Sequence, residues 1–461
     1  MCRTDVSLPR RRLLRAGLGG GVGALLGRGS LTRALAAGLP ARAAETEFFV
    51  LIHAAGGWDV TLWADPRNTR AGLVEPASTA NTDTAGLRAW VDQPLDGDVR
   101  SFGLVQPPGA RMAFGPGIGA LAELADRLCI VNGLAMNTVS HPDGIAFSVT
   151  GRHLQGSRNA QASLNTLLAN ELGLTQPFPS ISIQFPSSYA GESLDRRAAP
   201  LLVDRVGSIG SVLTRAPQPF DAADAAGLTA VLSSEAATTA ARGGHGDLAQ
   251  GMGLQLGGVA RMLDKSTQDV FNDGKLRAAH PEFDYQARFH GGTAVNAAFA
   301  IEAMRRNLVR CVSFAMGGLD THAGNYRNHA LVQQEMFDVV AALVRKLDAT
   351  AHPTRTGAKL SEHTHILVMS EFCRTPQVNL AGGRDHYPNN SALVISPRFR
   401  GNLAFGKTDP EQVLPVAVRR FSDGERAMAP PDLLATFVSA FGIDPRKYFR
   451  DGEVVPELRA A

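Results

Sequence analysis

The chain has 461 residues and a formal net charge of +3 at pH 7, and its excess of basic residues lies in the first 43 positions. That segment holds eight arginines and one aspartate, so residues 44–461 keep 38 basic and 42 acidic residues, a net charge of −4. These 418 residues are enough for one large α/β domain or two smaller ones, and their charge excludes a nucleic-acid-binding surface.

Residues 1–43 have the features of an export signal. The run Arg10-Arg11-Arg12-Leu13-Leu14-Arg15 is a twin-arginine pattern, and residues 16–27 behind it are too short and too rich in glycine for a stable membrane span. Small-x-small cleavage sites end at Ala36 and at Ala43. We therefore expect a periplasmic or secreted protein that leaves the cytoplasm folded by the twin-arginine route. A chance cluster of arginines is the alternative.

Three cysteines lie beyond the signal, at Cys129, Cys311 and Cys373. The first two lie in apolar, strand-like runs and should be buried thiols. Three cysteines cannot all pair, so we expect no disulfide framework. No second long apolar segment follows the signal, and we expect no membrane span in the mature chain.

The mature chain opens with an apolar run at residues 48–53, which predicts a buried strand. Gly56 and Gly57 follow, and glycines at this point let the backbone turn tightly and approach a ligand. Asp59 ends the turn and is either a metal ligand or the cap of a following helix. A dinucleotide-binding loop is not supported, because the G-x-G-x-x-G pattern is absent.

A helix around residues 119–126 leads into a second predicted strand at 129–131. The segment after it, up to Gly151, is predicted to be a strand-end loop that carries Ser140, His141 and Thr150. These residues offer hydroxyl groups and an imidazole, the groups that nucleophilic and base catalysis use. Ser140 before His-Pro also suits an ordinary turn.

The middle of the chain has helical character. Leucines at helical spacing predict an amphipathic helix at residues 159–173, and a strand follows at 180–185. Residues 216–279 are rich in Ala, Gly, Asp and Ser, with helical periodicity around 248–263. We predict a helical insertion or cap over approximately residues 195–290 that serves packing.

A third strand is predicted at residues 309–315, after a helix near 293–307. Two glycines separate it from Asp320 and His322. In an extended loop, positions i and i+2 point to the same side, so one cation could bind both side chains.

A fourth strand, at residues 365–369, is followed by Glu371 and Arg374 and then by Asp385 and His386. Carboxylate oxygens and imidazole nitrogens together suit zinc, manganese or iron. In the alternative interpretation, Glu371 pairs with Arg374 and His386 is an ordinary loop histidine. A helix at 331–347, a strand at 391–395 and a helix at 433–441 complete the predicted elements.

Four predicted strand ends thus carry candidate ligands or catalytic groups: carboxylates, imidazoles and one serine hydroxyl. Parallel strands end at one edge of a sheet, so these loops can converge on one pocket. The candidates are Asp59; Ser140 and His141; Asp320 and His322; and Glu371, Asp385 and His386.

The motifs together resemble a known family. The twin-arginine signal, strand-G-G-W-D, S-H, G-G-L-D-T-H, V-M-S-E-F-x-R-T and G-G-x-D-H resemble the secreted bacterial proteins grouped as domain of unknown function 1501. The resemblance covers most of residues 44–461, and Ser370–His386 is its most specific part. That family is similar to the alkaline phosphatase and sulfatase superfamily. This implies a three-layer α/β/α fold with a mostly parallel central sheet and a metal-dependent site.

The resemblance also implies roles for particular residues. Asp59 corresponds to the first metal-binding aspartate, and the segment from Ser140 to Thr150 lies where the superfamily carries its nucleophile. The remaining metal ligands would be Asp320, His322, Glu371, Asp385 and His386.

The sequence departs from the family and superfamily patterns at several positions. Cys373 replaces a usual Gly, Arg384 replaces a small residue, and Tyr387-Pro388 follows Asp-His where many members have Gly. Phosphatases of the superfamily have a further metal-binding histidine late in the chain, whereas His386 is the last histidine here. We therefore expect that a second metal is missing. The sulfatase nucleophile motif, C-or-S-x-P-x-R, is absent.

Two functions follow as expectations. The first is an exported hydrolase of phosphate or sulfate esters that uses a divalent zinc, manganese or calcium ion. Ser140 or Thr150 would be the nucleophile, His141 a general base or ligand, and Arg374 or Arg384 a donor to the anionic oxygens. The second is a non-catalytic exported protein with one structural cation that binds a glycan or a co-exported partner, which the lost late histidine favours.

Overall fold

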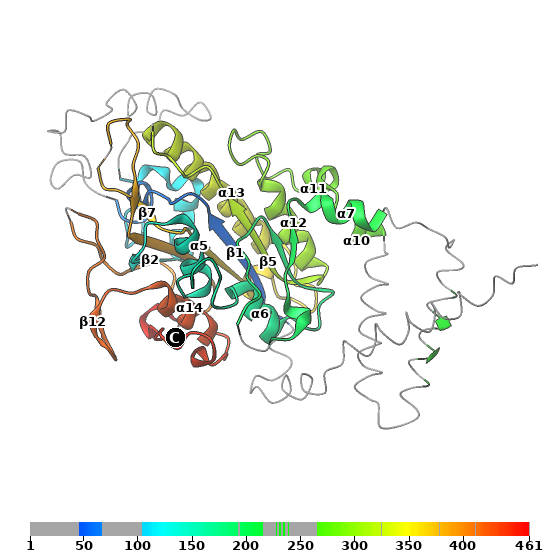
Figure 1. Ribbon diagram of the computed structural model, residues 1–461. Coiled ribbons are helices and arrows are strands. Elements are labelled where there is room, and N and C mark those ends of the chain that lie inside the picture. Colours follow the sequence, from blue (N-terminus) through cyan, green and yellow to red (C-terminus); the bar gives the residue numbers. More distant parts are fainter. Residues whose placement is uncertain are drawn as a thin grey trace, which may run out of the picture. The chain divides into compact units, whose positions relative to one another are not determined.

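The computed structural model describes residues 46–66, 104–191, 194–214 and 265–460, apart from 324, 378 and 411, with a few single positions between 227 and 238 (Figure 1). The chain divides into two compact units, one of residues 42–216 and 261–461 and one of residues 1–41 and 217–260. The first unit is the subject below. The export signal and the helix expected around 248–263 lie outside the described residues.

An eight-stranded sheet with the order β10-β2-β9-β6-β1-β5-β3-β4 forms the centre of this unit. Its strands are β1 (Phe48–Ala54), β2 (Leu128–Ala135), β3 (Phe178–Ile183), β4 (Leu201–Val203), β5 (Val309–Met316), β6 (Thr364–Met369), β9 (Asn389–Ile395) and β10 (Leu403–Phe405). Strand β9 is antiparallel to both of its neighbours, and the other neighbouring pairs are parallel. This confirms the predicted α/β class with a mostly parallel sheet.

The central strand β1 explains why the site forms where it does. All seven of its residues are buried, as expected for a parallel strand covered on both faces. It pairs with β5 up to Ala54↔Met316 and with β6 up to His53↔Met369. The three strands therefore end at the same level, and the loops that follow them begin side by side.

Helices cover both faces of the sheet (Figure 1). On one face, Phe48, Val50 and Ile52 of β1 share a core with α12 (Ala294–Arg305) and α13 (Ala330–Ala349). The alternate residue Leu51 lies on the other face with α5 (His141–Thr150), α6 (Leu164–Leu172) and α14 (Pro430–Ser439). Alternation along a strand assigns successive side chains to opposite faces.

The predicted loop after β2 is wrong in its second half, because residues 141–150 form the helix α5. Pro142 lies in its first turn, and Gly151 ends it with a left-handed φ of 72°, which are common start and stop signals. Gly144 lets this helix pack directly on the chain after β6, since a Cβ atom there would lie 2.5 Å from the Glu371 carbonyl oxygen.

The remaining elements include most of the predicted helices. The helix expected at 119–126 is the kinked 3₁₀ helix η2 (Pro116–Arg127). Part of the predicted insertion belongs to the sheet, because β4 pairs with β3. The other elements are η1 (Val60–Leu62), η3 (Arg196–Ala198), α7 (Val206–Thr214), α10 (Lys265–Asp269), α11 (Asp273–Ala279), η4 (Asn325–His329), η5 (Leu360–His363), β7 (Cys373–Arg374), β8 (His386–Tyr387), β11 (Arg419–Phe421), β12 (Gly424–Arg426), η6 (Pro445–Lys447) and η7 (Pro456–Leu458).

Two further expectations can be compared with the structure. Cys129 and Cys311 are buried, free thiols, which confirms the predicted burial, and Cys373 is buried and free as well. Of the helices in the described part of the chain, none is long and apolar enough to cross a membrane.

Candidate metal centre

The loops after β1 and β5 touch each other at the edge of the sheet. Gly56 has a φ of 118°, and a Cβ atom there would overlap the backbone between Leu319 and Asp320. Glycine is therefore required for the two loops to come this close. The same packing brings the loop after β5 under the segment that follows β6, where Arg374 contacts both loops.

Four side chains meet at this edge. Asp320, His141 and His386 each offer a ligand atom, and these atoms lie within 4.8 Å of one another. Asp320 Oδ1 lies 3.5 Å from His141 Nε2, 3.2 Å from His322 Nε2 and 3.8 Å from His386 Nε2. The Nε2 atoms of His322 and His386 are 3.0 Å apart. We call these four residues the histidine cluster.

Four separations within the histidine cluster are compatible with ligands of a single cation. Nitrogen and oxygen ligands about 2.0–2.1 Å from zinc stand roughly 3.3 Å from one another in a tetrahedral site. The three distances from Asp320 Oδ1 and the His322–His386 distance, 3.0 to 3.8 Å, lie on either side of that value. Two of the four residues are half exposed, with Asp320 at 54% and His322 at 49%, so the cluster is open to solvent.

Each histidine of the cluster is held through its other ring nitrogen. His141 Nδ1 lies 2.9 Å from Glu371 Oε1, His322 Nδ1 lies 2.6 Å from Asp385 Oδ1, and His386 Nδ1 lies 2.8 Å from the Val139 carbonyl oxygen. Ionised carboxylates and carbonyls only accept hydrogen bonds, so each Nδ1 donates and each Nε2 presents its lone pair to the cluster. Metal-binding histidines have this arrangement of outer partners.

Glu371 is the buried carboxylate of the site. Its Oε1 accepts from the Gly56 N–H at 2.8 Å, and its Oε2 accepts from the Ser370 hydroxyl at 2.9 Å. Burial raises its pKa, but the hydrogen bond from His141, the charge of His53 and the Gly56 N–H together bring that pKa down to about 2. In return, the Glu371 hydrogen bond raises the pKa of His141. Glu371 therefore orients His141.

Asp385 has the same relation to His322. The hydrogen bond from His322 lowers the pKa of this half-exposed carboxyl. Asn379 also donates to Asp385 Oδ1, at 3.3 Å. Asp385 and Glu371, both predicted to be metal ligands, are therefore outer partners of two histidines, and His141 joins the set that faces the cluster.

Arg374 holds Asp320. Its side chain is fully buried, and its Nη2 lies 2.6 Å from Asp320 Oδ1. Its other donors reach the carbonyl oxygens of Gly57 at 2.9 Å, Arg384 at 3.0 Å, and Gly56, and its Nη1 lies 3.4 Å from His322 Nε2. The buried guanidinium therefore contacts two members of the cluster, and its catalytic role toward anionic oxygens stays a prediction. The alternative pairing with Glu371 is wrong.

Asp59 does not join the cluster. It is buried and caps η1, with its Oδ1 accepting from the Thr61 N–H at 3.0 Å and from the Thr61 hydroxyl at 2.6 Å. Its Oδ2 accepts from Asn325 at 2.8 Å and lies 3.2 Å from Arg384 Nε. The assignment of Asp59 as a metal ligand is therefore wrong, and the capping alternative is confirmed. Arg384, a departure from the family pattern, is the ion-pair partner of this carboxylate.

The two candidate nucleophiles lie at opposite ends of α5. Thr150 is buried in its last turn and donates to the Ala146 carbonyl oxygen at 2.7 Å. A ten-residue helix is about 15 Å long, which separates Thr150 from the cluster and makes its predicted catalytic role wrong. Ser140 is exposed immediately before His141, and its side chain makes no capping hydrogen bond.

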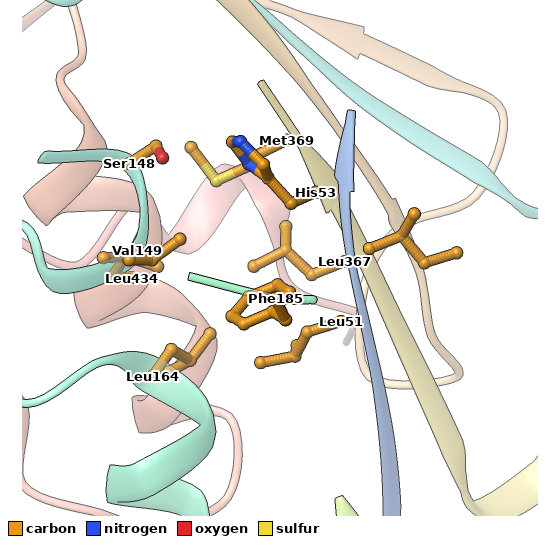
Figure 2. Close-up of a pocket in the computed structure, with 10 residues that line it drawn as sticks. Leu51, His53, Ser148, Val149, Leu164, Phe185, Leu367, Met369 and Leu434 are labelled. Atoms are coloured by element: carbon orange, nitrogen blue, oxygen red, sulfur yellow. The ribbon is translucent and has the colours of Figure 1, made fainter. Parts of the chain in front are cut away.

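The sequence interpretation missed His53, which lies beneath the site. Its Nε2 is 3.4 Å from Glu371 Oε2, and burial lowers its pKa. Figure 2 shows His53 beside Met369, whose side chain lies between it and Ser148 of α5. All three residues line a small cavity of about 20 Å³. A histidine inside an otherwise apolar strand was the signal that could have revealed it.

No curated protein matches the chain. Two solved structures are similar over most of its length. "Crystal structure of Ps i-CgsB" has 11% identity and a TM-score of 0.32, covering 88% of this chain and 75% of that chain. A structure from the metabolism of multiple glycosaminoglycans by Bacteroides thetaiotaomicron (BT33494S-sulf) has 8% identity and a TM-score of 0.26, covering 86% and 72%. The family model described as protein of unknown function, DUF1501, matches residues 106–453, so the chain belongs to the DUF1501 family.

Proposed function

We propose that the protein is a metal-dependent hydrolase of phosphate or sulfate esters. The observation that supports this best is the histidine cluster, in which the Nε2 atoms of three imidazoles each lie within 3.8 Å of Asp320 Oδ1. Each imidazole is anchored at Nδ1 by an acceptor that leaves its Nε2 lone pair directed inward. Lone pairs 3.0 Å apart on His322 and His386 repel unless a proton or a cation lies between them.

The ligand atoms narrow the choice of cation. Three nitrogens and one oxygen suit zinc or manganese, whereas calcium takes six to eight oxygens. We therefore propose zinc or manganese, not calcium. A divalent cation held by the cluster would polarise an ester oxygen and lower the pKa of a bound water molecule.

The chain's own residues supply orientation and a nucleophile. Glu371 and Asp385 fix the rings of His141 and His322, and Arg374 fixes the Asp320 carboxylate. Ser140 is exposed at the N-terminus of α5, where the first N–H groups of the helix favour a negatively charged group. We propose Ser140 as the nucleophile, with an ester of an anionic group bound between it and the cluster.

Two other parts of the proposal rest on the sequence. The twin-arginine motif supports export to the periplasm or beyond. An alkaline phosphatase-like arrangement is supported by a mostly parallel sheet whose site loops follow β1, β5 and β6. The substrate would then be an ester met outside the cytoplasm.

A second candidate function is a non-catalytic exported binding or assembly protein with a structural cation. The observation that favours it is the burial of the two arginines predicted as donors to substrate oxygens, Arg374 and Arg384. A glycan or a co-exported protein would be its partner.

Metal analysis combined with an ester panel tests these proposals. We expect the purified protein to hold about one equivalent of zinc or manganese and to hydrolyse p-nitrophenyl phosphate or p-nitrophenyl sulfate. His386→Asn should lose both the metal and the turnover, whereas His153→Asn, at a half-exposed histidine outside the cluster, should keep both. Metal without turnover on any ester supports the binding protein. Absence of metal contradicts both candidate functions.

A further inference from the structure

We infer that a second cavity, separate from the histidine cluster, binds a small amphipathic anion. It has a volume of about 370 Å³, within the range of small-molecule sites, and no cluster residue lines it. It lies between the segment that follows α5, the start of α6, the loop after β3 and the end of η6. We call it the α5–α6 pocket.

Part of the wall of the α5–α6 pocket is apolar. Five aliphatic side chains line it: Ala160, Ala162, Leu167, Ala190 and Leu194. Gly191 also lines the pocket, and its φ of 91° is a backbone conformation that favours glycine.

Another part of the wall is basic. Arg152, Lys447 and Arg450 line it, and no acidic side chain among the described residues does. Lys447 is paired with Glu171, but Arg152 approaches Asp451 only at 3.9 Å, and the Asp451 side chain is 79% exposed. An ion pair of that kind contributes little, and a bound anion can replace it.

Gln161 also lines the pocket, and its Nε2 is a buried donor with no hydrogen-bond partner within the described part of the chain. The pocket thus combines cationic groups with aliphatic side chains. This combination suits a carboxylate, sulfonate or sulfate on an apolar body.

A fluorescence titration with 2-naphthalenesulfonate tests the inference, with neutral 2-naphthalenemethanol as the matched analogue. We expect one sulfonate per chain, with a Kd at least tenfold lower than that of the alcohol. The double variant Arg152→Gln/Arg450→Gln should raise the Kd of the sulfonate at least tenfold and change that of the alcohol less than twofold. Lys275→Gln, at an exposed lysine of α11, should change neither.

Two variants block the pocket from its rim. Ala160→Trp and Ala190→Trp, both at half-buried positions, should abolish binding of both probes, and either suffices if the other does not fold. Unchanged sulfonate binding in a folded blocking variant would overturn the inference, as would a sulfonate that binds no more tightly than the alcohol or not at all at millimolar concentration. Asp320→Asn should leave the Kd unchanged. Loss of binding there would place the probe at the histidine cluster and also overturn the inference, whatever the outcome for the proposed hydrolase.

Discussion

His141 Nδ1 lies 2.9 Å from Glu371 Oε1, and this hydrogen bond connects the buried end of β6 to the exposed histidine cluster. The carboxylate holds the ring in one tautomer, so that Nε2 is directed at Asp320. The buried Glu371 carboxyl group has a pKa of about 2 and is therefore ionised at neutral pH. Through this hydrogen bond it fixes the His141 ring at the position where a cation would bind.

Glu371→Gln should weaken zinc binding without removing a ligand. A glutamine side chain keeps the shape but loses the charge that orients His141, and loss of such an outer partner typically costs 10- to 100-fold in metal affinity. Competition with a chromophoric chelator measures this change. Glu425→Gln, an exposed glutamate of the β11–β12 hairpin, is the control. Equal affinities in both variants would show that Glu371 has no orienting role.

Removal of the cation should lower the melting temperature. A cation that binds only the folded chain stabilises it by roughly 3–4 kcal/mol at a hundred- to thousandfold excess over its Kd. Calorimetry with and without a chelator should therefore show a drop of a few degrees for the wild type. Asp320→Asn should have a low melting temperature that barely responds to the chelator, whereas Asp348→Asn should respond like the wild type. A wild-type melting temperature that does not change with the chelator would argue against the metal centre.

Glu47 lies directly before β1, at the edge of the sheet opposite the histidine cluster, and should make the stability of the fold depend on pH. This buried carboxylate lies 2.6 Å from His365 Nε2 and 3.2 Å from His363 Nδ1. Burial raises its pKa, but the hydrogen bond and charge of His365, the charge of Arg398 and the hydrogen bond of His363 lower it to about 2 from an ordinary value of 4.5. A folded pKa below the unfolded one means that the stabilisation is fully present above about pH 4.5 and is lost as the pH falls toward 2.

Glu47→Gln should therefore unfold at a lower urea concentration at pH 7, because it loses roughly 3 kcal/mol of stability. The difference between variant and wild type should shrink between pH 4.5 and pH 2. Glu425→Gln should follow the wild type throughout. A difference that stays constant over this range would mean that packing, and not charge, is what the substitution removes.

The sequence predicted the features that depend on local pattern. Buried apolar runs gave the central strands, and the parallel arrangement of β1, β5 and β6 follows from them. The pairs Asp320/His322 and Asp385/His386 were found because each follows a predicted strand, and the structure brings them together.

The wrong sequence predictions concern residues whose roles depend on contacts between distant parts of the chain. Asp59 looks like a strand-end ligand, but its partner Arg384 is 325 positions away in sequence, and only the fold shows that they pair. The segment up to Gly151 was predicted to be a strand-end loop, and the family resemblance placed the nucleophile within it. Residues 141–150 instead form α5, which carries Thr150 away from the site.

Ser140 and Thr150 provide the sharpest test of the catalytic proposal, because the sequence offered both as nucleophiles and α5 separates them. Ser140→Ala should keep the metal and the melting temperature but lower turnover of the p-nitrophenyl ester at least a thousandfold. Thr150→Val keeps the shape and loses the hydrogen bond to the Ala146 carbonyl, so it should lower the stability by about 1 kcal/mol and leave turnover unchanged. Steady-state kinetics on metal-loaded protein, with the metal content of each variant measured, make the comparison. Full turnover in Ser140→Ala would exclude a covalent route through this serine, and loss of turnover in a folded Thr150→Val would contradict the placement of the site at the N-terminus of α5.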